Sequence, residues 1–158
     1  MKASSAPGIL TTIFLGLVLI LSGCGKPDTG LTNGRFSPCP DSPNCVSSMA
    51  SAPKQAIEPI AYEGRRDSAK QVMSSVIQSM KRSRLISDSE NYIHAEFRSL
   101  IFRFVDDVEL FFPENTNVIH MKSASRTGYS DFGVNRKRLE EIRRRFHSST
   151  SRSESYDN

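Results

Sequence analysis

Apolar residues in the middle of the chain repeat with the period of a helix. They recur at spacings of three and four residues from Ala69 onward, which places them on one stripe of an amphipathic helix. Asp67 or Ser68, shortly after Gly64, is the predicted N-cap, because a short side-chain oxygen there accepts a free backbone N–H. The methionines of the stripe are predicted to fill the core. The stripe consists of Ala69, Val72, Met73, Val76, Ile77 and Met80.

Alternation with a period of two takes over after this helix and predicts strands. An earlier segment, Ile57–Tyr62, is expected to form the first strand. Along residues 91–99, Ile93, Ala95 and Phe97 point to one face. The opposite face carries a polar set whose histidine is expected to be exposed to solvent: Tyr92, His94, Glu96 and Arg98.

Residues 102–112 form the next predicted strand. Asp106 interrupts its apolar face, so a β-bulge or bend is predicted near Asp106 and Asp107. The segment Pro113–Asn117 is predicted to turn the chain into a further strand that begins at Val118. The apolar residues of the interrupted face are Phe102, Phe104, Val108, Leu110 and Phe112.

A last helix is predicted from Val134 to His147, with Leu139, Ile142 and Phe146 on its buried side. The element order is therefore strand, helix, at least three strands, helix. This order predicts an α+β fold: a small single domain in which an antiparallel β-sheet carries two helices on one face.

The N-terminal segment has the pattern of an export signal. Lys2 precedes an apolar run, Ile9–Leu21, that is shorter than the roughly 20 residues a helix needs to cross a bilayer. The sequence Leu-Ser-Gly-Cys that ends at Cys24 resembles the lipobox of bacterial lipoproteins. That resemblance implies cleavage before Cys24, a diacylglycerol on its sulfur and an acyl chain on the new amino terminus. The alternative is an ordinary cleaved signal peptide followed by a chance cysteine.

A lipid on Cys24 would hold the domain on a membrane and decide its location. The protein is then expected to face the periplasm of a bacterial cell, and Gly25, in place of an Asp, favours the outer over the inner membrane. Membrane lipid bound through Cys24 is the expected partner, together with an envelope protein or an anionic ligand. Nucleic acid is excluded by the export signal, and no cofactor is expected apart from the covalent lipid.

Two further cysteines, Cys39 and Cys45, remain available as thiols once Cys24 is lipidated. An even number of thiols in an exported protein favours a disulfide between them. Free or redox-active thiols are the first alternative. A metal site is the second, and it would need two more ligands, for which His94 and His120 are the candidates although their spacing does not require it. No metal is therefore expected.

Composition divides the chain into four segments. The part after Cys24 is rich in Gly, Thr, Asn and Pro and reads as a spacer, and the C-terminal end is polar throughout. The expected division is a signal peptide (1–23), a flexible tether (24–37), the folded domain (38–147) and a disordered tail (148–158).

Positive charge is concentrated in the predicted last helix. The net charge of the chain is only +4, and much of it lies between Arg136 and Arg145. A solvated helix face with pairs such as Glu141 to Arg145 is the favoured interpretation. Attraction to anionic lipid headgroups or envelope phosphates is the alternative.

Three segments of the chain resemble the signatures of the bacterial "domain of unknown function 1499" family. They are Pro38–Ser48, Phe104–Leu110 and Ser123–Arg143, and the resemblance extends over nearly all of the predicted domain. Family members commonly have Arg where this chain has Lys122 and an aliphatic residue where it has Thr127. Lysine keeps the charge but loses the two-pronged geometry of arginine. The family has no assigned activity, so the resemblance implies a fold and a location and names no reaction.

The polar residues of the last two signatures form a candidate cluster with three interpretations. The first is an internal network, in which Asp131 caps the last helix and an aspartate of the strand pairs with Arg126. The second is an anion site formed by Arg126 and Arg136 at the helix N-terminus. The third is acid–base catalysis that also involves His94 and His120, although no known catalytic motif is present. The candidate cluster consists of Asp106, Asp107, Arg126, Asp131, Asn135 and Arg136.

These observations favour a non-enzymatic envelope lipoprotein that binds a ligand or a protein partner at the membrane surface. An enzyme that acts on an anionic envelope substrate through the Asp/Arg cluster is the alternative. A structural subunit of an envelope complex, with the basic last helix as its contact, is a further alternative. No catalytic residue is assigned.

Overall fold

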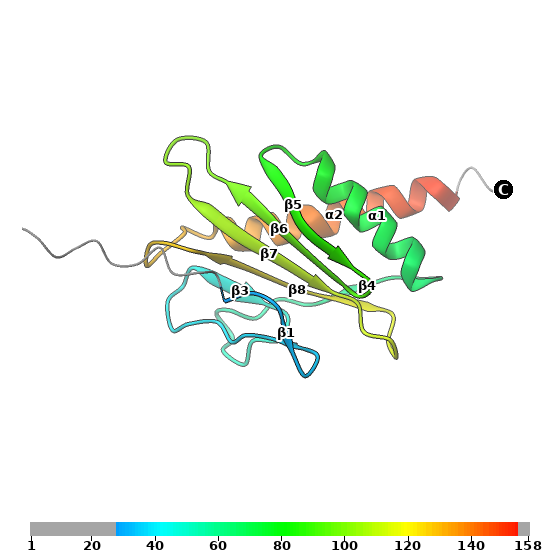
Figure 1. Cartoon of the computed structure of the whole chain (residues 1–158), viewed down its shortest axis with the longest axis horizontal. Helices are drawn as coiled ribbons and strands as arrows, with labels where there is room; N and C mark the ends of the chain where they lie inside the picture. The colour runs from blue at the N-terminus through cyan, green and yellow to red at the C-terminus, as the bar shows by residue number, and fades with distance from the viewer. Residues whose placement is uncertain (1–27, 155–158) are drawn as a thin grey trace, which may run out of the picture.

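A computed structural model describes residues 28–154, so the predicted signal peptide and Cys24 lie outside the described residues. Its main sheet is antiparallel, with the strand order β3-β8-β7-β6-β5 and with β4 paired to β8. Two helices cover one face of this sheet (Figure 1), which confirms the predicted α+β fold. The elements are β1 (Leu31–Thr32), β2 (Arg35–Phe36), β3 (Cys45–Ser47), β4 (Ile60–Ala61), α1 (Arg66–Ser79), β5 (Ser83–Ser89), β6 (Tyr92–Arg98), β7 (Val105–Phe111), β8 (Val118–Ser125) and α2 (Val134–Glu154).

The apolar stripe of α1 lies against the sheet as predicted. Ala69, Met73 and Ile77 are buried in one hydrophobic core together with the apolar face of β6. Full burial of a large aliphatic side chain contributes roughly 1.5–3 kcal/mol, so this stripe fixes the helix on the sheet. Val72 and Met80 are partly buried at the edge of the same core.

The helix begins slightly earlier than its sequence suggests. The predicted N-cap at Asp67 or Ser68 is wrong, because the cap is Arg65, whose backbone is extended and whose side chain makes no capping hydrogen bond. Asp67 lies in the first turn. A negative charge there interacts favourably with the positive end of the helix dipole, which accounts for the acid without a cap.

The predicted bulge in β7 is wrong. β7 pairs with β6 and β8 in unbroken register, and the register shift of this sheet lies in β5, between Leu85 and Ser87. Asp106 stays on the helix-covered face because Arg138 of α2 binds its carboxylate at 2.6 Å. A paired charge therefore occupies a position in an apolar row without breaking the strand.

Two strands are shorter than predicted. The first predicted strand, Ile57–Tyr62, reduces to β4. β7 begins at Val105, so Phe102 and Phe104 lie in the β6–β7 loop and are exposed. β3, β5 and the β1–β2 hairpin have no counterpart in the sequence prediction, because they are short or lack a clear alternation.

Residues 28–37, predicted as part of a flexible tether, pack on the sheet instead. β1 and β2 form an antiparallel hairpin (Figure 1, blue). Its turn contains Asn33 and Gly34, both with positive φ, a conformation that these two residue types tolerate well. The N–H of Gly30 donates to a carboxylate oxygen of Glu109 on β7 at 2.7 Å. The tether prediction is therefore wrong for these residues.

The last helix starts where it was predicted and ends later. α2 begins at Val134 and runs to Glu154, past the predicted end at His147. Residues 148–154 of the predicted disordered tail are thus helical. Leu139, Ile142 and Phe146 are fully buried in the core, as predicted. Within residues 28–154, no helix is both long enough and apolar enough to cross a membrane.

Candidate functional site

Asp106 and Asp107 are neighbours in β7, so their side chains lie on opposite faces of the sheet. Asp106 faces the helices and binds Arg138, whereas Asp107 faces away from them and binds Arg126. The predicted polar cluster is consequently divided between two separate groups of charges. Asp106 and Asp107 therefore do not form a carboxylate pair that could take part together in acid–base catalysis.

On the face away from the helices, one arginine joins two carboxylates. Arg126 follows β8 directly, and its Nε and Nη2 donate to the two oxygens of Asp107, both at 2.8 Å. Nη2 also donates to Glu96 of β6 at 2.6 Å. The Nε2 of His94 lies 2.7 Å from Asp107 and completes the group. We refer to His94, Glu96, Asp107 and Arg126 as the open-face cluster.

The register of the strands explains why this cluster needs its arginine. Glu96 and Asp107 are direct cross-strand partners, so two like charges lie on neighbouring positions of the same face. Their side chains are only 7% and 5% exposed, and water cannot screen the repulsion. Arg126 binds both carboxylates, and Arg84 adds a further hydrogen bond to Glu96 at 2.9 Å. The cluster is therefore balanced by cations from β5 and from the end of β8.

Burial and hydrogen bonding have opposite effects on the pKa values of these carboxylates. Burial raises the pKa of Asp107, but hydrogen bonds from Arg126 and His94 outweigh it and hold the pKa below its ordinary value of 3.8. Burial likewise raises the pKa of Glu96, and Arg84 and Arg126 reverse the effect. The hydrogen bonds to Asp107 raise the pKa of Arg126. All three groups are consequently ionised at neutral pH.

The prediction that His94 is exposed to solvent is wrong. It is buried, with 9% of its side chain exposed. An ionised carboxylate only accepts hydrogen bonds, so the Nε2 of His94 carries the hydrogen that Asp107 accepts. The alternation of polar residues along the two strands could have indicated this contact. It places His94 and Asp107 on the same face of neighbouring strands.

A second buried group lies further along the same face. Glu109 of β7 is 1% exposed, and its carboxylate accepts hydrogen bonds from the hydroxyl of Tyr92 and from the N–H of Gly30, both at 2.7 Å. The Nζ of Lys122 lies 3.1 Å from the same carboxylate and also donates to the carbonyl of Asp28. Burial, followed by the charge of Glu109, raises the pKa of Tyr92 above its ordinary value. Lys122 therefore fastens the N-terminal segment to the sheet.

The helix-covered face carries a buried ion pair between β7 and α2. Nη2 of Arg138 donates to Asp106 at 2.6 Å, and the guanidinium lies over the ring of Phe97 at 5.0 Å from its centroid. Nη1 donates to Asn135 and to Ser123. The sequence prediction missed Arg138. An acid within an apolar strand face requires a cation on whatever packs against it, and that requirement is the signal that points to the last helix.

The remaining members of the predicted cluster serve the start of α2. The carboxylate of Asp131 accepts the N–H groups of Gly133 and Asn135 at 3.0 and 2.7 Å, which is the predicted capping role. Asn135 is fully buried and binds the carbonyl of Asn44. Arg136 donates to backbone carbonyls of residues 54 and 56. Arg126 and Arg136 thus bind different partners and do not form one anion site.

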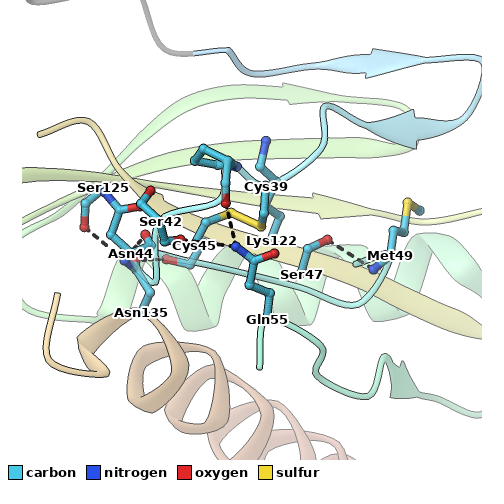
Figure 2. The surroundings of a disulfide bond; sticks show 12 residues. Cys39, Ser42, Asn44, Cys45, Ser47, Met49, Gln55, Lys122, Ser125 and Asn135 are labelled. Atoms are coloured by element: carbon cyan, nitrogen blue, oxygen red, sulfur yellow. Dashed lines mark hydrogen bonds between the residues drawn. A yellow bond between two sulfur atoms is a disulfide. The ribbon is translucent and has the colours of Figure 1, made fainter. Parts of the chain in front are cut away.

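The predicted disulfide between Cys39 and Cys45 is present, with the two Cα atoms 5.6 Å apart (Figure 2). Cys45 lies in β3, opposite Ala124 of β8. The side chain of Gln55 donates to the carbonyls of Pro40 and Ser42 and holds the closed loop in place. The disulfide therefore belongs to the segment that connects the hairpin to the sheet edge.

The histidines do not converge on the cysteines. His120 lies 3.1 Å from the hydroxyl of Ser48 and stacks on Phe111, away from His94 and its aspartate. In the described part of the chain, no three or more His, Cys, Asp or Glu side chains are arranged to hold a metal ion. The groups that the structure does bring together are carboxylates with arginines or a lysine.

Searches among curated proteins and among solved structures found no match to the chain. A family model described as "protein of unknown function (DUF1499)" matches residues 35–146. This span contains the disulfide, the buried ion pairs on both faces of the sheet and the core residues of both helices. The chain belongs to this family of proteins of unknown function.

Proposed function

We propose that this protein is a bacterial envelope lipoprotein, anchored in the membrane through Cys24, whose domain is a non-enzymatic binding module. The lipobox-like Leu-Ser-Gly-Cys motif supports the anchor. The Cys39–Cys45 disulfide is consistent with the oxidising compartment that export would provide. We place the domain on the periplasmic side, with the outer membrane favoured over the inner.

The observation that carries the non-enzymatic part is that every carboxylate oxygen of the open-face cluster already binds a partner. Both oxygens of Asp107 accept hydrogen bonds from Arg126, and one of them also binds His94. The two oxygens of Glu96 are bound by Arg126 and Arg84. A general base needs a pKa near the working pH, whereas these carboxylates have lowered pKa values. We therefore infer that the cluster fixes the fold and does not act on a substrate.

The packed N-terminal segment also bears on the anchor. The carbonyl of Asp28 is already bound to Lys122 on β8. Three residues lie between it and Cys24, and an extended chain over those four steps spans at most about 14 Å. A lipid on Cys24 would thus hold the domain against the bilayer surface rather than at the end of a long tether. That short reach supports a role at the membrane surface.

Labelling with radioactive palmitate tests the anchor directly. Cells that produce the full chain should incorporate label into it, and the labelled protein should sediment with membranes. The matched Cys24→Ala variant should lose the label and should not be processed. Label that persists in Cys24→Ala, or a parent chain recovered without any acyl group, would contradict the proposal.

A further inference from the structure

Two loops with exposed apolar side chains lie at the same end of the sheet. The β6–β7 loop (99–104) leaves the sheet beside the β8–α2 linker (126–133), because Arg98 pairs with Val105 and Asp106 pairs with Ser125. Both loops are seen at the left end of the molecule in Figure 1. The exposed residues, with Val134 of α2 among them, are Leu100, Ile101, Phe102, Phe104, Tyr129, Phe132 and Val134, and we call this set the apolar tip.

The exposure of the apolar tip is unusual for a small domain. Phe132 is 89% exposed, Ile101 is 78% exposed and Leu100 is 73% exposed. Among the described residues, Ile86 is the one large exposed apolar side chain outside the tip. Phe132 also has a positive φ of 53°, which a bulky residue adopts only when its surroundings impose it. A concentrated apolar surface of this kind marks an interaction site.

A basic cavity of about 330 Å³ lies beside the tip. Five cationic side chains line it, no acidic side chain does, and Val134 is shared between the cavity and the tip. Arg138 is bound to Asp106, and Arg98 lies 3.6 Å from Glu96. The five cations are Lys81, Arg82, Arg98, Lys137 and Arg138.

Within residues 28–154, the amino groups of Lys81 and Lys137 have no carboxylate partner, so both charges are available to an incoming anion. Arg103, at the tip itself, is exposed and likewise unpaired within the same range. The one acid of the two loops, Asp131, is engaged in capping α2. This end of the molecule is therefore positively charged around an apolar centre.

We propose that this end of the domain docks on a bilayer that contains anionic phospholipid. The apolar tip enters the interfacial region, where aromatic and aliphatic side chains leave water, and the basic cavity receives the phosphate of a lipid headgroup. A protein partner with an apolar groove would satisfy the tip, but the adjoining cations favour an anionic lipid surface. The placement near a membrane rests on the proposed lipoprotein function, whereas the docking surface itself does not require a lipid on Cys24.

The absence of tryptophan from the chain allows a direct test. Phe132→Trp and Leu100→Trp each place one fluorophore in the tip. Thr116→Trp, in the exposed β7–β8 turn at the opposite end of the sheet, is the matched control. The full chain, purified from cells, is mixed with phosphatidylcholine vesicles with or without phosphatidylglycerol, and the acyl chains carry bromine as a quencher. Thermal unfolding checks that each variant folds like the parent.

In vesicles with phosphatidylglycerol, the two tip tryptophans should show blue-shifted emission and quenching by the brominated chains, and the control should show neither. Reversing the free charges with Lys81→Glu and Lys137→Glu should remove most of the quenching at the Phe132→Trp position. Equal quenching at both ends, or none at the tip, would overturn the proposal. So would a photo-crosslinker at position 132 that captures a protein in intact cells while the tip stays unquenched on vesicles.

Failure of this proposal can be told apart from failure of the anchor. If palmitate labels Cys24 but the tip tryptophans remain in water, the lipoprotein function stands and the docking surface is lost. If Cys24 carries no lipid but the tip is quenched in anionic vesicles, the docking surface stands and the anchor is lost. Each experiment thus decides one claim.

Discussion

The two faces of the sheet handle buried charge in different ways. On the helix-covered face, one acid, Asp106, lies in an apolar row and is matched by one cation, Arg138. On the open face, one arginine, Arg126, binds two opposed carboxylates and lies in a row with further buried charges. The first arrangement is an isolated pair inside a core, and the second is a network that joins residues of neighbouring strands. We therefore expect the same substitution to have different consequences on the two faces.

The largest expected effect is on the open face. Arg126→Met removes the cation that binds Glu96 and Asp107, which are direct cross-strand neighbours. Two buried carboxylates then repel each other with only the exposed Arg84 left to compensate them, and we expect a loss of about 4 kcal/mol in the free energy of unfolding. Urea unfolding at neutral pH, followed by circular dichroism, measures it.

Arg98→Met is the matched control for that experiment. Arg98 lies on the same face and also approaches Glu96, but at 3.6 Å and with 44% of its side chain exposed. Exposed ion pairs contribute little, so a loss below about 1 kcal/mol is expected. Similar losses for the two variants would show that the network is not what stabilises this face.

The second expected effect is on the helix-covered face. Arg138→Met leaves Asp106 buried without a cation, and we expect a loss of about 3 kcal/mol. Adding Asp106→Leu removes the orphaned charge and restores an apolar row. Because a buried ion pair contributes little compared with well-packed apolar residues, the double variant should return to within about 1 kcal/mol of the parent.

A double-mutant cycle in urea completes the comparison, since neighbouring residues are expected to deviate from additivity. On the open face, Arg126→Met combined with Asp107→Leu should remain strongly destabilised, because Glu96 keeps only the exposed Arg84 and His94 loses its acceptor. Equal rescue on both faces would remove the distinction between an isolated pair and a network.

The parts of the fold that could be predicted are those with a repeated local pattern. The apolar residues of α1 and α2 recur at helical spacing in the sequence, and the structure buries those same residues in the core. The start of α2 was predictable because Asp131 caps it locally. The hairpin of residues 31–36 was not predictable, because a pair of two-residue strands has no periodicity and depends on its contact with Glu109.

The candidate site was predicted in its members but not in its arrangement. Period two already places Asp106 and Asp107 on opposite faces, yet the break in the apolar row suggested a bulge. The row is regular because its acid is paired with Arg138, a contact across 32 residues that no local pattern contains. The pairing of Glu96 with Asp107 depends likewise on the exact register of two strands.

The smallest expected effect is the dependence of stability on pH, and it reports mainly on the open face. The pKa values of Asp107 and Glu96 are lowered in the folded state from their ordinary values of 3.8 and 4.5. Between the folded and the ordinary values, the unfolded chain binds more protons. The stabilisation is therefore fully present above the ordinary pKa values and is lost as the pH falls through the folded ones.

Asp107→Asn should consequently flatten the acid limb of a plot of the urea midpoint against pH, besides lowering stability at neutral pH. Added salt separates this contribution from a surface one. The pKa of Glu141 is also lowered, by hydrogen bonds from Arg144 and Arg145, but these groups lie on the exposed side of α2 where salt screens them. The slope that Asp107→Asn removes should persist at high salt, because its partners are buried. A slope that salt abolishes entirely in the parent protein would assign the acid sensitivity to the helix surface and not to the open-face cluster.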